Sequence, residues 1–411
     1  MKNLYKKIYE AINTGIQKAL ALDDEDDVSI IYQHKKISND FNIDKLLQER
    51  QDEYKKLIEN KDFYGCLNLY NSEYLHFEKR TIGYKVETRD ELIILVSNFN
   101  DTDWNNFDLN WIDVSKIIYM NSIFNMLEYF NCNISEWDVS NVINMDAMFF
   151  NCVHFNQNIS AWDVSNVKSM HNMFFNCQYF NYNINAWNVS KVTNMSGMFH
   201  GCTLFNQDLN NWDVSNVTNM FDMFSRCRVF NKPLNQWNVS KVINTAYMFN
   251  QCNKFNQILK NWNVSNVINM NNMFSECYAF NKSLNQWDVS NVTDMNSMFK
   301  DCYAFNRSLN QWDVSKVTDM NSMFKGCSRF NQPLDYWDVS HVNNMYCMFE
   351  WCKNFNQPLN SWKVFNVKNM SFMFQSCHSF NQPLNSWEIA NDTETLKMFN
   401  NCPIEEKNKP I

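Results

Sequence analysis

The sequence predicts an α/β repeat solenoid made of 25-residue units, preceded by a small α-helical domain. Tryptophan recurs every 25 residues from Trp137 to Trp387 without an insertion. Each unit repeats the same apolar positions, and a single unit is too short to bury them, so neighbouring units must cover one another. Aromatic residues make up 16% of the 411 residues, against 6 Gly and 6 Pro, so a packed core is expected rather than disorder.

With the tryptophan as position 1, the unit reads W-D/N-V-S-N/K-V-x-N/D-M-x-x-M-F-x-x-C-x-x-F-N-x-x-L-N-x. Leu309, Trp312 and Val314 follow the spacing L-x-x-L-x-L, whose last part alternates as in a short strand. Stacking the units aligns these segments in parallel. The sequence therefore predicts a parallel sheet of short strands along the array.

The second half of the unit has a helical spacing. Met295, Met298, Phe299 and Cys302 follow i, i+3, i+4, i+7, which is one face of a short helix. The residue before this segment belongs to the preferred N-cap types in unit after unit, as Asp294 does here. The pattern predicts one short helix per unit.

Four domains follow from these patterns and from the change in composition near residue 84. They are a helical N-terminal domain (1–83), an entry segment (84–111), the repeat array (112–402) and a polar tail (403–411). Within the first domain, Leu4, Ile8, Ile12, Ile16 and Leu20 mark one helix face, and a second helix is predicted over 42–60. In the entry segment, Thr88-Arg89-Asp90-Glu91 is a capping box that predicts a helix start.

Two polar or thiol positions recur with the period. Eleven of the fourteen cysteines fall every 25 residues from Cys152 to Cys402, and no CxxC pair occurs. They predict a ladder of buried free thiols rather than disulfides or a zinc site. The asparagine at position 20, from Asn156 to Asn381, is expected to bond to main-chain groups in a turn, coil after coil.

The unit resembles the 25-residue repeat of the BspA-like leucine-rich-repeat "bacterial surface protein" family, on the stretch Val292-Thr293-Asp294-Met295, Met298-Phe299, Cys302 and Phe305. The resemblance covers about 320 of 411 residues. It implies a leucine-rich-repeat-like fold and a role in adhesion or protein binding. Such repeats occur in bacterial surface proteins, large DNA viruses and protists.

Position 2 forms a polar column on the predicted strand face. Its carboxylates are candidate partner-binding residues: Asp138, Asp163, Asp213, Asp288, Asp313 and Asp338. Two interpretations are open. The side chains bond to turn amides of their own coil, or they form an acidic recognition surface for a basic or extended partner.

Three function classes compete. The first is a non-catalytic protein-binding or scaffold protein, and the second is a surface or virion structural or adhesion protein. An enzyme ranks far behind, because the P-loop, HExxH and EF-hand motifs are absent and the seven histidines share no repeat position. No cofactor is expected.

Charge and the N-terminal sequence set expectations for partners and location. A net charge of -8 disfavours nucleic acid as a partner. Neither a secretory signal nor a membrane-spanning stretch is recognisable. The expected location is intracellular, in the host cytoplasm if the chain is viral, with a virion or cell-surface location as the alternative.

Overall fold

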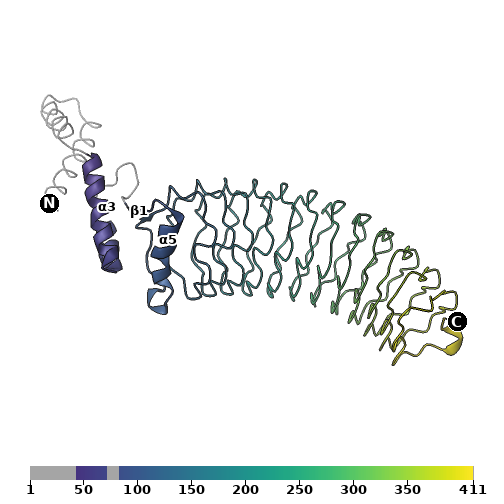
Figure 1. The fold of residues 1–411 in the computed structure, drawn as a ribbon. Helices are drawn as coiled ribbons and strands as arrows, with labels where there is room; N and C mark the ends of the chain where they lie inside the picture. The colour runs from purple at the N-terminus through teal and green to yellow at the C-terminus, as the bar shows by residue number, and fades with distance from the viewer. Residues whose placement is uncertain (1–42, 72–82, 411) are drawn as a thin grey trace, which may run out of the picture. The chain divides into compact units, whose positions relative to one another are not determined.

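The computed structural model describes residues 43–71 and 83–410 (Figure 1). The helix predicted from Leu4 to Leu20 lies outside these residues. The described chain divides into two units. One holds the residues up to Glu87 together with Asp108–Lys116, and the other holds Thr88–Phe107 and the residues from Ile117 onward. The segment 84–111, predicted as an entry segment, contributes to both units.

The described residues of the first unit form two helices and a two-stranded sheet: α3 (Ile43–Glu59), α4 (Phe63–Asn71), β1 (Tyr84–Lys85) and β2 (Ile112–Asp113). Helix α3 confirms the helix predicted over 42–60. The strands pair in parallel, with Tyr84 opposite Ile112. Tyr54 of α3 is fully buried and its ring stacks on Trp111, with 5.9 Å between the centroids. This stacking attaches α3 to the sheet.

The second unit begins with a capped helix. Helix α5 (Arg89–Val96) starts where the capping box predicted, and the Thr88 hydroxyl accepts a hydrogen bond from the Glu91 amide at 3.2 Å. Three short 3₁₀ segments complete its helical content: η1 (Ser97–Phe99), η2 (Thr102–Trp104) and η3 (Glu406–Asn408). From Ile117 the chain winds into coils that follow one another in a row (Figure 1).

The prediction of a short helix in every repeat is wrong. Residues 295–302 form successive turns, in which the amides of Met298, Lys300 and Cys302 each donate to the carbonyl three residues earlier. Ser297 and Asp301 have positive φ, at 54° and 57°, and such residues interrupt a right-handed helix. Positive φ at the third residue of the turns from 295 and 299 is the signature of type II turns.

The adjoining coil explains why turns replace the helix. The amides of Met295, Ser297 and Phe299 donate to carbonyls of the next coil, at 2.7–3.1 Å. In a helix these amides would donate to carbonyls four residues earlier in the same chain. Stacking therefore takes over the main-chain hydrogen bonding that a helix would supply, while the Met and Phe side chains still point inward.

The predicted sheet is also misplaced. The segment around Leu309, Trp312 and Val314 contains turns and no strand. Neighbouring coils do align in parallel, but through a single bridge per coil at position 8, such as Asp294 with Asp319. That position was predicted to cap a helix. Its side chain instead caps a turn, since the Asp294 carboxylate accepts from the Asn296 amide at 2.9 Å.

The core of the array follows the predicted apolar positions. The tryptophans at position 1 are 2–4% exposed, and the Val, Met, Phe, Cys and Leu positions of the inner coils are almost completely buried. Rings stack from coil to coil, with 6.2 Å between the centroids of Trp262 and Trp287 and 5.8 Å between Phe274 and Phe299. The inward assignment of these positions is confirmed.

Candidate functional site

The predicted Asp column is used within each coil. Its carboxylates accept a hydrogen bond from the serine amide two residues later, as Asp288 does from Ser290 at 3.1 Å. The same bond occurs at every candidate carboxylate: Asp138, Asp163, Asp213, Asp288, Asp313 and Asp338. Asn188 makes the equivalent bond to Ser190 at 3.2 Å. One oxygen of each side chain therefore shapes its own turn, whether the residue is Asp or Asn.

At Asp213 and Asp288 these turn bonds also favour the ionised carboxylate. The side-chain and main-chain hydrogen bonds from Ser290 lower the pKa of Asp288, and Ser215 acts in the same way on Asp213. Asp213 and Asp288 therefore stay ionised at lower pH than an ordinary aspartate does. Whether a partner contacts it remains a prediction.

A second row of exposed side chains follows position 18. It consists of Tyr129, His154, Tyr179, Leu204 and Val229, and we call it the aromatic row. From His154 to Val229 each residue lies between the buried cysteine and the buried phenylalanine of its coil, Tyr129 directly precedes the buried Phe130, and all five residues are exposed. The ring of His154 lies between the two tyrosine rings, with centroid distances of 5.3 and 5.2 Å.

The main chain holds this row in register. The amide of His154 donates to the Glu128 carbonyl at 3.1 Å, and that of Tyr179 to the Val153 carbonyl at 3.2 Å. Sequence reasoning missed the row because position 18 has no consensus residue. The signal was present in the run of Tyr, His, Tyr, Leu and Val at successive copies of one position, which the periodicity places side by side.

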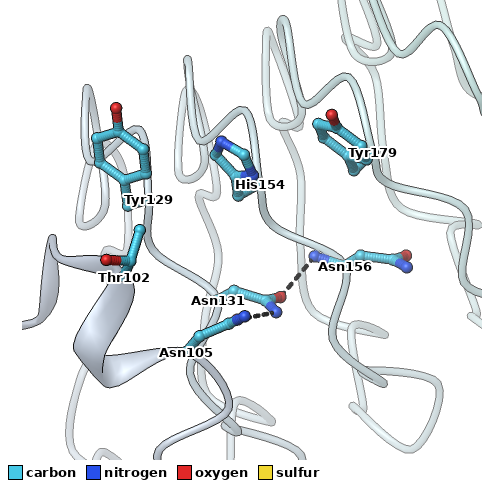
Figure 2. A pocket seen from close by; sticks show the side chains of 7 residues that line it. All are labelled: Thr102, Asn105, Tyr129, Asn131, His154, Asn156 and Tyr179. Carbon is cyan, nitrogen blue, oxygen red and sulfur yellow. Dashed lines mark hydrogen bonds between the residues drawn. The ribbon is translucent and has the colours of Figure 1, made fainter.

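A hollow of about 230 Å³ lies beside the start of the aromatic row (Figure 2). Three asparagine side chains line its floor. The amide nitrogen of Asn131 donates to Asn105 at 2.7 Å, and its oxygen accepts from the main-chain amide of Asn156 at 2.9 Å. The latter bond belongs to the predicted asparagine ladder, which is confirmed from Asn156 to Asn381.

Aromatic edges, tyrosine hydroxyls and amide groups therefore meet at one exposed place on the array. Tyrosine and asparagine supply contact area and adaptable hydrogen bonding, and both are typical of protein-binding surfaces. Histidine adds a polar ring that stacks without interrupting the row. The hollow is small and open to solvent, so it suits a side chain of a larger partner better than an enclosed small molecule.

The side chains of Ser196 and His171 approach closely between two coils. Nδ1 of His171 lies 2.7 Å from the Ser196 hydroxyl, but this hydroxyl donates to the Asn194 side chain at 2.8 Å and Ser196 is buried. A serine nucleophile needs its proton directed at the base. The hydroxyl is committed to Asn194, so this contact holds two coils together and does not form a nucleophile–base pair.

Residues 43–71 and 83–410 contain no group of three or more His, Cys, Asp or Glu side chains arranged for a metal ion. Over the same residues, no helix combines the length and apolar character needed to span a membrane.

A family model covers the whole array. The family described as "Mycoplasma protein of unknown function, DUF285" matches residues 94–190, 158–260, 232–316 and 305–410. The chain belongs to this family. No curated protein matches the chain. Membership in the DUF285 family confirms that the chain is a repeat protein of a family without a known function, and it does not single out the BspA-like repeats that the sequence resembles.

Proposed function

We propose that this DUF285 protein is a non-catalytic protein-binding or scaffold protein whose aromatic row is the contact surface. The observation that carries the proposal is the exposure of Tyr129, Tyr179 and Leu204, which are 40%, 49% and 47% accessible to solvent on three of four successive coils, the other being the coil of His154. Contiguous exposed apolar side chains on a soluble surface are typical of binding sites. The array is proposed to act as a leucine-rich-repeat-like, BspA-like solenoid that presents this row rigidly.

The stacking of the coils supports a binding role rather than a chemical one. The apolar consensus positions of the inner coils are buried between neighbours, and their asparagine, aspartate and cysteine side chains bond to main-chain groups. The residues at the outward positions can therefore differ from one coil to the next. Repeat proteins use such variable positions on a rigid array to bind partners.

The proposal includes an intracellular location. All fourteen cysteines are free, thirteen of them are buried, and none forms a disulfide. Free thiols in this number are typical of a reducing compartment. Recovery of the chain from intact virions or from the cell surface would favour the alternative, a structural or adhesion role.

The test is affinity capture from an extract of the native cells. The triple variant Tyr129→Ser, Tyr179→Ser, Leu204→Ser is compared with the control Ile243→Ser, Ile258→Ser, Ile268→Ser, whose residues are each 50% exposed elsewhere on the array. The aromatic-row variant should lose the captured partner, whereas the control should keep it. Both variants should melt at nearly the wild-type temperature, because all six side chains are exposed. Equal capture by the two variants contradicts the proposal.

A further inference from the structure

The asparagine ladder uses only one half of each side-chain amide. At position 20 the Oδ1 oxygen accepts from the main-chain amide of the asparagine in the following coil, as Asn181 does from Asn206 at 2.9 Å. Because that partner is an N–H group, the atom that faces it must be the oxygen, and this fixes the orientation of each amide. The Nδ2 group of each asparagine, which we call a rung, is left with two N–H donors for other partners.

Within the described chain, these donors find acceptors only at the two ends of the ladder. Nδ2 of Asn131 donates to Oδ1 of Asn105 at 2.7 Å, and Nδ2 of Asn381 donates to Oε1 of Glu405 at 3.1 Å. No group in residues 43–71 or 83–410 accepts from Nδ2 of the rungs between them: Asn156, Asn181, Asn206, Asn231, Asn256, Asn281, Asn306, Asn331 and Asn356. These side chains are exposed or half-buried, so a partner can reach their donors.

The first of these rungs lie beside the aromatic row. From the coil of His154 onward, the row residue at position 18 and the rung at position 20 flank the buried phenylalanine at position 19. In Figure 2 the asparagines line one side of the hollow, and the rings of the row line the other. A partner that contacts the row therefore also lies beside the rungs from Asn156 to Asn231.

The step from rung to rung suits the main chain of an extended peptide. The phenylalanine rings that directly precede the rungs from Asn156 to Asn231 stack with 5.9–6.0 Å between centroids. In an extended chain every second carbonyl points the same way, and two residues advance by roughly 6.4–6.8 Å. The difference adds up to about 1–3 Å over three steps. Small rotations about the broad χ2 torsion of asparagine absorb a difference of this size.

A peptide main chain fits the rungs better than other acceptors do. Donors that recur at a fixed step need acceptors that recur at the same step, and peptide carbonyls do so whatever the sequence. A folded domain directs most of its carbonyls into its own secondary structure. The net charge of -8 disfavours a polyanion.

We propose that the partner of the aromatic row is an extended segment of another protein, with every second carbonyl accepting from a rung between Asn156 and Asn231. The segment runs along the row, and the side chains on one of its faces meet the row and the hollow beside Tyr129. This inference rests on the proposed protein-binding role of the row and names the form of the partner. The rungs supply affinity for any main chain, and the row supplies selectivity.

The probe is a phage-displayed library of random linear dodecapeptides, panned on the intact chain. Enriched peptides are synthesised, and their Kd values are measured by fluorescence polarisation. The double variant Asn181→Asp, Asn206→Asp keeps an oxygen for each ladder bond and removes both Nδ2 donors. It should weaken peptide binding about tenfold or more, because two hydrogen bonds are lost.

A matched control makes the same change away from the aromatic row. Asn306→Asp, Asn331→Asp lies on coils whose position 18 holds Ala304 and Arg329. This control should keep the wild-type Kd. Both double variants should melt near the wild-type temperature, since the carboxylates still accept the ladder bonds. Equal Kd values for the two double variants overturn the inference.

A second measurement leaves the protein unchanged. Each carbonyl of the tightest peptide is replaced in turn by a thioamide, whose sulfur is a weaker hydrogen-bond acceptor than oxygen. The loss of affinity should alternate with a period of two residues, and losses without that alternation overturn the inference.

Two further outcomes separate this inference from the proposed function. If no dodecapeptide is enriched, although the variant Tyr129→Ser, Tyr179→Ser, Leu204→Ser still loses a partner captured from cells, the extended segment is wrong and the row remains the contact surface. If enriched peptides bind this row variant as tightly as the wild type, the row is not the contact surface, and both proposals fail.

Discussion

At the scale of single residues, short polar side chains act mainly on the main chain. Asp and Asn alternate freely at position 2, because both offer an oxygen to the serine amide two residues later. At position 20 only the amide side chain recurs, and its oxygen accepts the amide of the next asparagine, as Asn281 does from Asn306 at 3.1 Å. These bonds give each coil its shape and set its distance from the next.

Two substitutions of Asp288 separate the contribution of its hydrogen bond to stability from the contribution of its charge. Asp288→Asn keeps an acceptor for the Ser290 amide and should leave the unfolding free energy nearly unchanged. Asp288→Ala removes the acceptor and should cost about 0.5–1 kcal/mol, the usual net contribution of one hydrogen bond. Chemical denaturation of the three proteins measures the difference. Equal destabilisation by both changes would assign the effect to charge instead.

The wild-type protein and the Asp288→Asn variant should also differ in how their stability depends on pH. The folded-state pKa of Asp288 is lowered by its bonds from Ser290, so its contribution is present above the unfolded-state pKa and is lost as pH falls through the folded-state value. Asp288→Asn should therefore remove this residue's share of the acid destabilisation. The share is small because the carboxylate is exposed. Melting temperatures of both proteins between neutral and acidic pH test the sign.

At the scale of the coil, two residues per repeat adopt positive φ whatever their type. At position 11 they range from Gly197 to Phe372, and at position 15 from Gly201 to Trp351. Side chains larger than hydrogen are disfavoured there, so the junction bonds must offset the strain. A Cβ at Gly197 would lie 1.9 Å from the Asn172 side-chain oxygen, so the Asn172 side chain would have to move to admit a larger residue there.

Ala147 tests this strain. Its φ is 53°, and Ala147→Gly should stabilise the protein by about 0.5–1 kcal/mol because glycine adopts this conformation without a steric penalty. Ala161→Gly is the control, because Ala161 does not have positive φ. This substitution should destabilise the protein by a similar amount, since glycine increases the entropy of the unfolded chain. Thermal unfolding compares the two. Destabilisation by both changes would show that Ala147 carries no strain.

The cysteine column predicts a graded reactivity along the array. Burial raises the pKa of the Cys302 thiol well above its usual range, and the thiolate is the form that reacts. Cys402 in the last coil is only partly buried. A thiol reagent should therefore modify Cys402 first in native protein and the inner thiols only on unfolding. Mass spectrometry follows the order, and modification of Cys302 as fast as Cys402 would contradict it.

At the scale of the whole array, stability should depend on whether equivalent positions of neighbouring coils stay opposite one another. Deleting residues 237–261 joins Gln236 to Trp262 and removes one complete coil, so every remaining junction keeps its bonds. Deleting residues 237–248 instead places unlike positions opposite one another. We expect a small loss of melting temperature for the first deletion and extensive unfolding for the second, because repeat stability is nearly a sum over neighbours. Equal melting temperatures would contradict stacking in register.

The sequence by itself determined the period, the inward positions, the asparagine ladder and the start of α5, because a strict repeat makes each position meet its own copy. Only the tertiary structure decided how the main chain runs between the inward side chains. The spacing of Met295, Met298 and Phe299 suits a helix and a series of turns equally well. Hydrogen bonds to the next coil select the turns, since they take the amides that a helix would use. The aromatic row follows from this stacking, which no single repeat encodes.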